Sequence, residues 1–271
     1  MALRNSGPIC RCRSADNSRG EKGLENSELK KIKLLGVPVS NCDIEGALRA
    51  LKIFLVDGRQ HQVIFLNRKG LFRARYDAEY RRCLQQASLV LPVNGQLVKS
   101  AKLLKLNRIY RFYPFEFIIR MLSLTERMNL SVYLLGARKG ELERAEKNLR
   151  DSFPGLSVVG RFSGYYSKDM EKDIILTIKK TSPAFLLVGS GIPGRDLWIL
   201  RHKKELNSGV FLWVDDCFNI FSGKVNHPPK WLMKFGLESL FGLYKRPWRL
   251  LLIFPYLYYW VLSLVYKIFK L

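Results

Sequence analysis

The sequence predicts an α/β protein with a mostly parallel sheet and helices on both faces, followed by a C-terminal membrane-associating helical appendage. Short aliphatic runs alternate with longer amphipathic stretches across residues 31–215, and this alternation is typical of βαβ crossovers between parallel strands. Basic and aromatic residues replace the alternation from residue 224 onward. We therefore divide the chain into a polar extension (1–28), an α/β core (29–223) and a basic, aromatic appendage (224–271).

The polar extension contains almost no residues that a core could bury, so we expect it to be mobile. Within the core, each aliphatic run is expected to contribute a strand: 31–39, 62–67, 88–93, 131–136, 156–162, 184–190 and 210–215. The stretches between them have helical character: 43–56, 69–87, 95–104, 114–128, 139–152, 168–181 and 194–206. Ligands of parallel sheets bind beyond the carboxyl ends of the strands. The loops to search are therefore those after Leu66, Pro92, Leu135, Val188 and Val214.

The charge balance indicates an anionic partner. The chain has 46 Lys and Arg against 23 Asp and Glu, a formal net charge of +23, which favours nucleic acid, a membrane surface or a phosphorylated substrate. A hydrophobic content of 48% excludes general disorder. The five cysteines are scattered without zinc-site spacing, so we expect reduced thiols in the cytosol and no metal. The chain starts without a signal-peptide run, and none of its three histidines belongs to a recognisable triad.

The appendage contains 17 consecutive uncharged residues, 250–266, interrupted by Pro255 and flanked by basic residues on both sides. An ideal helix of this length falls short of a hydrocarbon core of ~30 Å. We expect an interfacial or re-entrant anchor, with a short transmembrane span and a buried core helix as alternatives. The residues expected to contact the membrane are Trp248, Tyr256, Tyr258, Tyr259, Trp260, Lys267 and Lys270.

Three longer strings, at 136–166, 186–206 and 218–250, resemble in order and spacing the WecG/TagA/CpsF family of glycosyltransferases. The resemblance covers roughly residues 34–250. It implies an α/β enzyme without a metal or other cofactor, acting at the cytoplasmic face of the cell membrane as a peripheral or monotopic protein. Such an enzyme moves a sugar, here an N-acetylhexosamine or its uronic acid, from a UDP donor to a polyprenyl-diphosphate-linked sugar with inversion.

Two loops of the family's site are altered in this chain. Where the family has Thr-Pro-Asn after the second strand, only Asn67 is kept, and it is either a substrate-binding residue or a helix cap. The next loop of the family has Pro-Asp-Gly, whose Asp is the proposed general base. This chain has Asn94 and Gly95 instead. The neutral Asn94 cannot take a proton, so it either forms a turn or orients the sugar while another group acts as the base.

Candidate phosphate-binding residues follow from the same resemblance. Arg108 aligns with an arginine near the donor diphosphate, and a solvated surface role is the alternative. The family's Gly-x-Pro-Lys-Gln-Glu loop reads 191–196 here, with Gly191 kept and Arg195 in place of the Gln that contacts the donor. An arginine at a helix start would strengthen an anion site. Arg249 is the arginine that remains in the appendage.

The final strand carries Asp215 and Asp216 where the family has two small residues, and Asn219 where it has an Asp. The two carboxylates are candidates for the missing base, with Glu116 as a further one. They could also bind a divalent metal or cap the short helix that follows.

Two functional hypotheses remain. The first is an active membrane-associated glycosyltransferase of surface-glycan synthesis. The second is a catalytically impaired relative that serves as a binding or scaffold subunit of a glycan-assembly complex. The expected partners are the UDP-sugar donor, the polyprenyl-diphosphate-linked acceptor, an anionic membrane surface, and either a second copy of the chain or another glycan-assembly protein. We expect no nucleic-acid partner, because base-stacking motifs and a reading element are both absent from the sequence.

Overall fold

The computed structural model describes residues 31–107 and 109–224, together with Val261 and Lys267. The polar extension and nearly all of the appendage lie outside the described residues, and so do these predicted site residues: Arg108, Trp248, Arg249, Tyr256, Tyr258, Tyr259, Trp260 and Lys270. Lys267 is exposed. Among the described residues, no helix has both the length and the apolar character needed to cross a membrane.

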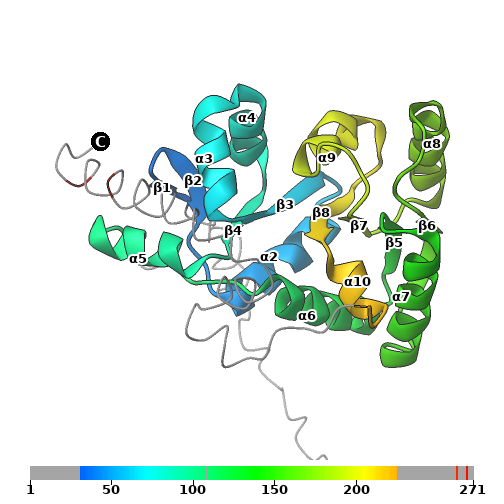
Figure 1. Ribbon diagram of the computed structural model, residues 1–271. Helices are drawn as coiled ribbons and strands as arrows, with labels where there is room; N and C mark the ends of the chain where they lie inside the picture. Colours follow the sequence, from blue (N-terminus) through cyan, green and yellow to red (C-terminus); the bar gives the residue numbers. More distant parts are fainter. Residues whose placement is uncertain (1–30, 108, 225–260, 262–266, 268–271) are drawn as a thin grey trace, which may run out of the picture.

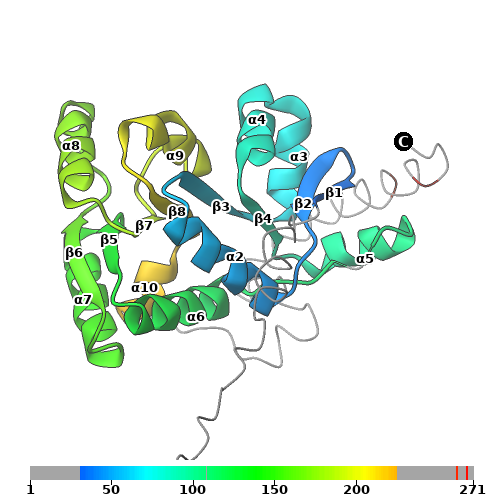
Figure 2. The ribbon, with the colours of Figure 1, turned by 180° about the vertical axis from the view of Figure 1, so that it is seen from behind.

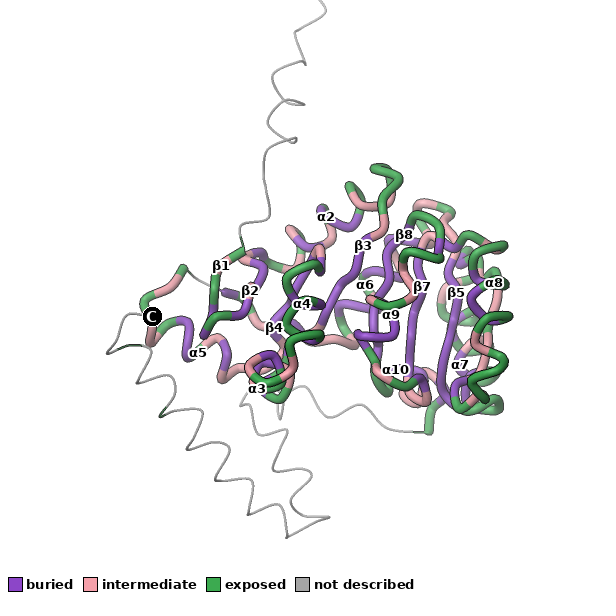
Figure 3. The backbone as a smooth tube through the Cα atoms, turned by 90° about the horizontal axis from the view of Figure 1, so that it is seen from above, coloured by how far each residue is buried: buried purple, intermediate pink, exposed green. Residues whose placement is uncertain are grey.

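Six parallel strands form one sheet in the order β4-β3-β8-β7-β5-β6 (Figure 1), which confirms the predicted α/β class. Their bounds are β3 (Gln60–Leu66), β4 (Leu89–Pro92), β5 (Ser131–Leu135), β6 (Ser157–Phe162), β7 (Phe185–Gly189) and β8 (Gly209–Asp215). The last strand, β8, lies between β3 and β7 in the middle of the sheet. Figure 3 shows that the central strands are almost entirely buried, as expected for a parallel sheet covered on both faces.

Helices cover both faces (Figures 1 and 2). One face packs against α2 (Ile44–Val56), α6 (Pro114–Arg127), α7 (Lys139–Ser152) and α10 (Cys217–Phe221). The other packs against α3 (Arg68–Tyr76), α4 (Ala78–Gln86), α5 (Gly95–Leu103), α8 (Glu171–Thr181) and α9 (Asp196–His202). Two single turns, η1 (Lys168–Met170) and η2 (Lys203–Glu205), adjoin α8 and α9. Successive strand side chains serve opposite faces: Val63 packs in the first core and Ile64 in the second. Each such burial contributes ~1.5–3 kcal/mol.

The first predicted strand, 31–39, is a hairpin outside the main sheet. Strands β1 (Lys31–Leu34) and β2 (Val37–Ser40) pair antiparallel around Leu35 and Gly36, whose φ angles are +50° and +82°. Two successive positive φ angles are typical of the tight turn that fits the twist of a hairpin. The hydroxyl of Ser40 accepts a hydrogen bond from the amide of Val90 at 2.9 Å, which ties the hairpin to β4.

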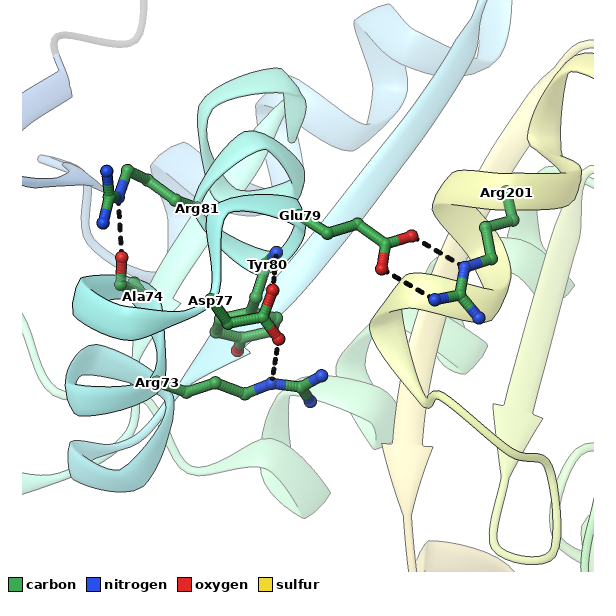
Figure 4. Close-up of polar contacts among 7 residues, drawn as sticks. All are labelled: Arg73, Ala74, Asp77, Glu79, Tyr80, Arg81 and Arg201. Atoms are coloured by element: carbon green, nitrogen blue, oxygen red, sulfur yellow. Dashed lines mark hydrogen bonds and ion pairs between the residues drawn. The ribbon is translucent and has the colours of Figure 1, made fainter.

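The predicted stretch 69–87 is two helices that meet at Asp77 (Figure 4). Asp77 has an extended backbone, and its carboxylate accepts hydrogen bonds from the amide of Tyr80 at 2.9 Å and from Nε of Arg73 at 2.8 Å. The extended backbone of Asp77 therefore ends α3, and its carboxylate caps α4.

Candidate active site

A cavity of about 460 Å³ lies at the carboxyl ends of β3, β4 and β8, where the sequence directed the search. Four of the predicted site residues line it: Asn67, Arg195, Asp215 and Asp216. They come from three different loops, which the parallel sheet brings to one edge. Aromatic and aliphatic residues complete the wall, among them Phe65, Val93, Phe112, Tyr113, Phe115 and Trp213.

Four cationic side chains line the cavity. Lys69 and Arg73 come from α3, Arg111 from the segment before α6, and Arg195 from the start of α9. The Nε of Arg73 is held by Asp77, while its two terminal nitrogens point away from that carboxylate (Figure 4). Guanidinium and ammonium groups gathered in one cavity attract phosphate oxygens. The cavity therefore has the chemistry of a site for a phosphorylated ligand.

Arg195 is held in a strained backbone conformation. Its φ of +56° and ψ of −122° are rare for a residue with a side chain and cost on the order of 1–3 kcal/mol. Gly194 before it also has a positive φ, of +84°. These two residues turn the chain sharply into the seven-residue helix α9. The surrounding fold must supply the free energy that keeps Arg195 at the cavity wall.

Two carboxylates follow each other at the end of β8. Asp215 has a φ of +48°, and both it and Asp216 are exposed. Desolvation by the surrounding protein and the charge of Asp216 raise the pKa of Asp215, although Arg195 opposes them. Asp216 precedes α10 but its side chain caps no backbone amide; it accepts a hydrogen bond from Nδ2 of Asn219 at 3.2 Å. In the part of the chain that the structure describes, no group of three or more metal-ligating side chains occurs.

A third carboxyl, Asp196, was not predicted. It is 8% exposed, lines the cavity, and its Oδ1 is buried without a hydrogen-bond partner. Burial raises the pKa of Asp196 to about 7, against the hydrogen bond from its own amide and the charges of Arg195 and Arg73. The nearby charge of Asp215 raises this pKa further.

The main chain of Asp196 is firmly anchored. Its carbonyl accepts hydrogen bonds from Nε2 of Gln62 at 2.8 Å and from Sγ of Cys83 at 3.6 Å. Both partners are buried. The carbonyl of Asp196 is thus hydrogen-bonded, while Oδ1 of its carboxyl has no partner.

A family model described as the "Glycosyl transferase WecG/TagA/CpsF family" matches residues 32–270. This chain belongs to the WecG/TagA/CpsF family. The resemblance carried by the three sequence strings is confirmed, and the chain is a glycosyltransferase.

Curated relatives agree with this family. One from Staphylococcus aureus (strain NCTC 8325 / PS 47) is named N-acetylglucosaminyldiphosphoundecaprenol N-acetyl-beta-D-mannosaminyltransferase. It is 24% identical over 219 residues, which cover 80% of this chain and 85% of the relative. A relative of the same name from Bacillus subtilis (strain 168) is 21% identical over 215 residues, 79% of this chain and 83% of that protein.

The two asparagines at the altered loops of this WecG/TagA/CpsF glycosyltransferase both cap helices. Oδ1 of Asn67 accepts a hydrogen bond from the amide of Gly70 at 2.8 Å, at the start of α3. Oδ1 of Asn94 accepts one from the amide of Gln96 at 2.9 Å, at the start of α5. Asn67 lines the cavity as well, whereas Asn94 is not among the residues that line it. Position 94 therefore brings no carboxylate to the site.

Gly95 and Gly191, the two predicted glycines of the site, lie outside the cavity lining. A Cβ at Gly95 would lie 3.7 Å from Nη1 of Arg111, whose Nε donates to the carbonyl of Val93 at 3.0 Å. Gly191 has a φ of +90°, and a Cβ there would lie 2.6 Å from the ring of Tyr165. Gly191 therefore needs to be glycine, because of its positive φ and the close Tyr165 ring, whereas the contact at Gly95 is an ordinary van der Waals distance.

Glu116, the further base candidate, lies on the exposed surface of α6. It pairs with Arg120 at 3.3 Å and is not among the residues that line the cavity. The carboxyls at the cavity are therefore Asp196, Asp215 and Asp216.

Proposed function

We propose that this glycosyltransferase moves an N-acetylhexosamine, or the corresponding uronic acid, from a UDP donor to a polyprenyl-diphosphate-linked sugar in surface-glycan synthesis. The observation that carries the proposal is the cavity in which four cationic side chains and three carboxyls meet. The names of the relatives from S. aureus and B. subtilis support an acceptor on undecaprenyl diphosphate and an N-acetylated donor sugar.

Both proposed substrates carry a diphosphate, and the cationic side chains are matched to that chemistry. Arg195 and Arg73 lie on the α9 and α3 side of the cavity, and Arg111 on the β4 side. We assign the donor diphosphate to Arg195 with Arg73, because a guanidinium fork fits two phosphate oxygens at once. Arg111 then serves the acceptor. Asn67, beside Lys69, orients the donor sugar by hydrogen bonds.

The proposed transfer inverts the anomeric centre without a metal. A carboxylate takes the proton of the acceptor hydroxyl, and the oxygen bonds to the anomeric carbon. The bond from that carbon to the diphosphate oxygen breaks, and its electron pair leaves with UDP. Asp215 and Asp216 are the candidates for this base that the sequence analysis supplies, and Asp196 is a third carboxyl at the same cavity.

We further propose that the enzyme works at the cytoplasmic face of the cell membrane, held there by the appendage. Residues 224–271 contain eight Lys and Arg and one Glu, a net charge of +7 (8 − 1), which favours an anionic bilayer. A flotation assay with vesicles that contain anionic lipid checks this. The full chain should float with the vesicles and a chain truncated before Lys224 should not; equal behaviour of the two would contradict the proposal.

The transfer itself is tested by donor turnover. Detergent-solubilised full-length protein is incubated with UDP-N-acetylhexosamine donors and a polyprenyl-diphosphate-linked N-acetylglucosamine acceptor, and UDP release and glycolipid product are measured. We expect turnover that depends on both substrates. Binding of the UDP-sugar without turnover of any donor would instead favour the second hypothesis, a binding or scaffold subunit. The neutral Asn94 is the observation that supports this second hypothesis.

A further inference from the structure

The strongest unexplained feature of the cavity is the Asp196 carboxyl. The buried residues of a folded protein normally find partners for their polar atoms. Among the described residues, only Asp196 and Asn219 have a buried side-chain oxygen without one. Asp196 is the one of these two that lines the cavity. A buried carboxylate oxygen without a partner destabilises the fold. Its position at a ligand cavity therefore indicates a role in function.

The surroundings of Asp196 favour proton transfer. Arg195 on its own loop, Arg73 on α3 and Asp215 on β8 are the charged groups that act on it. Tyr80 and Cys83 of α4 lie near Asp196 and are neutral. Burial and the charge of Asp196 raise the pKa of the Tyr80 hydroxyl, and they raise the pKa of the Cys83 thiol to about 12. Two cations thus permit Asp196 to ionise, while burial keeps its affinity for a proton high.

The other oxygen groups near the cavity are less suited to this task. Asn94 is neutral and uses its Oδ1 to cap α5. Asp216 is exposed and accepts a hydrogen bond from Asn219. Desolvation raises the pKa of Asp215 as well, but Asp215 is exposed, whereas Asp196 is buried and its Oδ1 has no partner.

We propose that Asp196, rather than Asp215 or Asp216, takes the proton from the acceptor hydroxyl. This inference rests on the proposed function. As the acceptor O–H bond breaks, the proton goes to the Asp196 carboxylate and the oxygen bonds to the anomeric carbon of the donor sugar. The bond from that carbon to the diphosphate oxygen breaks with its electron pair on UDP. Asp196 afterwards returns the proton to solvent. Asp215 acts through its charge, which raises the proton affinity of Asp196.

The test compares full-length Asp196→Asn with wild type and with Asp173→Asn, a control in the first turn of α8 where the side chain is exposed. UDP release from a UDP-N-acetylhexosamine donor is followed with the polyprenyl-diphosphate-linked acceptor, and UDP affinity is measured by calorimetry. We expect Asp196→Asn to lower kcat by ~10²–10⁴-fold with UDP affinity retained. The control should match wild type.

The pH profile separates a base from a structural residue. In wild type, kcat/KM should rise with pH along a limb whose apparent pKa is near 7, and the residual activity of Asp196→Asn should lack this limb. Asp215→Asn should move the limb to lower pH without abolishing it, since the variant removes a neighbouring negative charge. Formate should restore part of the activity of Asp196→Ala and leave the control unchanged.

Each other outcome overturns the inference. A loss in Asp196→Asn of less than about tenfold, a limb that persists in that variant, or a loss of UDP affinity as large as the loss of activity would show that Asp196 is not the base. If wild type and Asp196→Asn turn over the donor equally well, the inference about Asp196 fails but the proposed function stands. Wild type that turns over no donor overturns the proposed function, and this inference falls with it.

Discussion

The polar residues near the two ends of strand β3 differ in whether their side chains have hydrogen-bond partners. At the amino end, His61 lies between Ser88 and Asp57: its Nδ1 is 2.8 Å from the Ser88 hydroxyl and its Nε2 is 2.8 Å from the Asp57 carboxylate. The ring of Phe54 stacks on the imidazole at 4.0 Å. At the carboxyl end, about 20 Å further along the strand, lies the cavity with the unpartnered Asp196 oxygen.

The amino end resembles a Ser-His-Asp triad in composition but not in setting. The imidazole is nearly buried, and both of its nitrogens are bonded inside the protein. His61 is not among the residues that line the candidate active-site cavity. A completed network of this kind stabilises the fold, whereas the strained and unpartnered groups at the carboxyl end destabilise it. The comparison predicts that substitutions at the two ends change stability in opposite directions.

The largest expected effect is a gain in the unfolding free energy of Asp196→Asn. Because the folded state raises the pKa of Asp196 from 3.8 to about 7, the contribution of this carboxyl to stability falls as pH rises from about 4 to about 7 and stays constant above that. Asp196→Asn has no charge to bury. At about pH 8 the variant should exceed wild type by on the order of 2–4 kcal/mol in urea unfolding, and at about pH 4 the difference should nearly vanish. A variant that is less stable than wild type at both pH values would contradict the comparison.

At the opposite end, His61→Ala should destabilise the protein by about 2–3 kcal/mol, because it removes the stacked ring and leaves the Asp57 and Ser88 partners unpaired. Urea unfolding at neutral pH measures the loss. The kcat and KM of the folded variant should equal those of wild type. A change in kcat/KM of more than about threefold, with the fold intact, would mean that the two ends are coupled.

Arg195→Gly should again stabilise, by about 1 kcal/mol, since glycine accepts the positive φ that strains Arg195. The same substitution removes a cation from the cavity. We expect the KM for the UDP-sugar to rise by ~10-fold or more, because the variant loses a charged hydrogen bond to phosphate. Arg195→Lys, which keeps the charge and the strain, is the matched control: it should show no gain in unfolding free energy.

The smallest effect is expected at the exposed ion pair between Glu79 of α4 and Arg201 of α9 (Figure 4). The two hydrogen bonds are both 2.7 Å long, yet water and salt screen exposed charges. Glu79→Gln should leave the thermal midpoint and kcat/KM unchanged within error in buffers of physiological ionic strength. A clear loss of activity would reveal that the pair positions α9, and with it Arg195.

The sequence predicted the strands well, because each buried strand is a short aliphatic run between amphipathic stretches. The order of the strands was not predictable, since the position of β8 between β3 and β7 depends on packing between distant segments. The hairpin was missed because its turn is Leu35-Gly36, without the Asn-Gly pair that usually marks such a turn. The break at Asp77 had a signal, an Asp within a helical stretch that can cap the next helix.

The site was predicted in part for a physical reason. Parallel strands bring their carboxyl ends to one edge, so Asn67, Arg195 and Asp215 could be grouped from the sequence. Lys69 and Arg73 could not be singled out in a chain with 46 Lys and Arg. Asp196 stood in the family motif, but its importance depends on burial and a missing partner, which only the fold reveals.

The central place of β8 has a consequence for synthesis. The ribosome delivers this strand after the other five strands of the described sheet, yet β8 alone joins the β4-β3 pair to the β7-β5-β6 set. Until it inserts, β3 and β7 each have an additional unpaired edge, and such edges are prone to mispairing. Asp215 arrives with it, and so a chain that stops short of Gly209 lacks part of the lining of the candidate active-site cavity. The enzyme cannot act before this core is finished, and residues 224–271 follow directly behind it in the sequence.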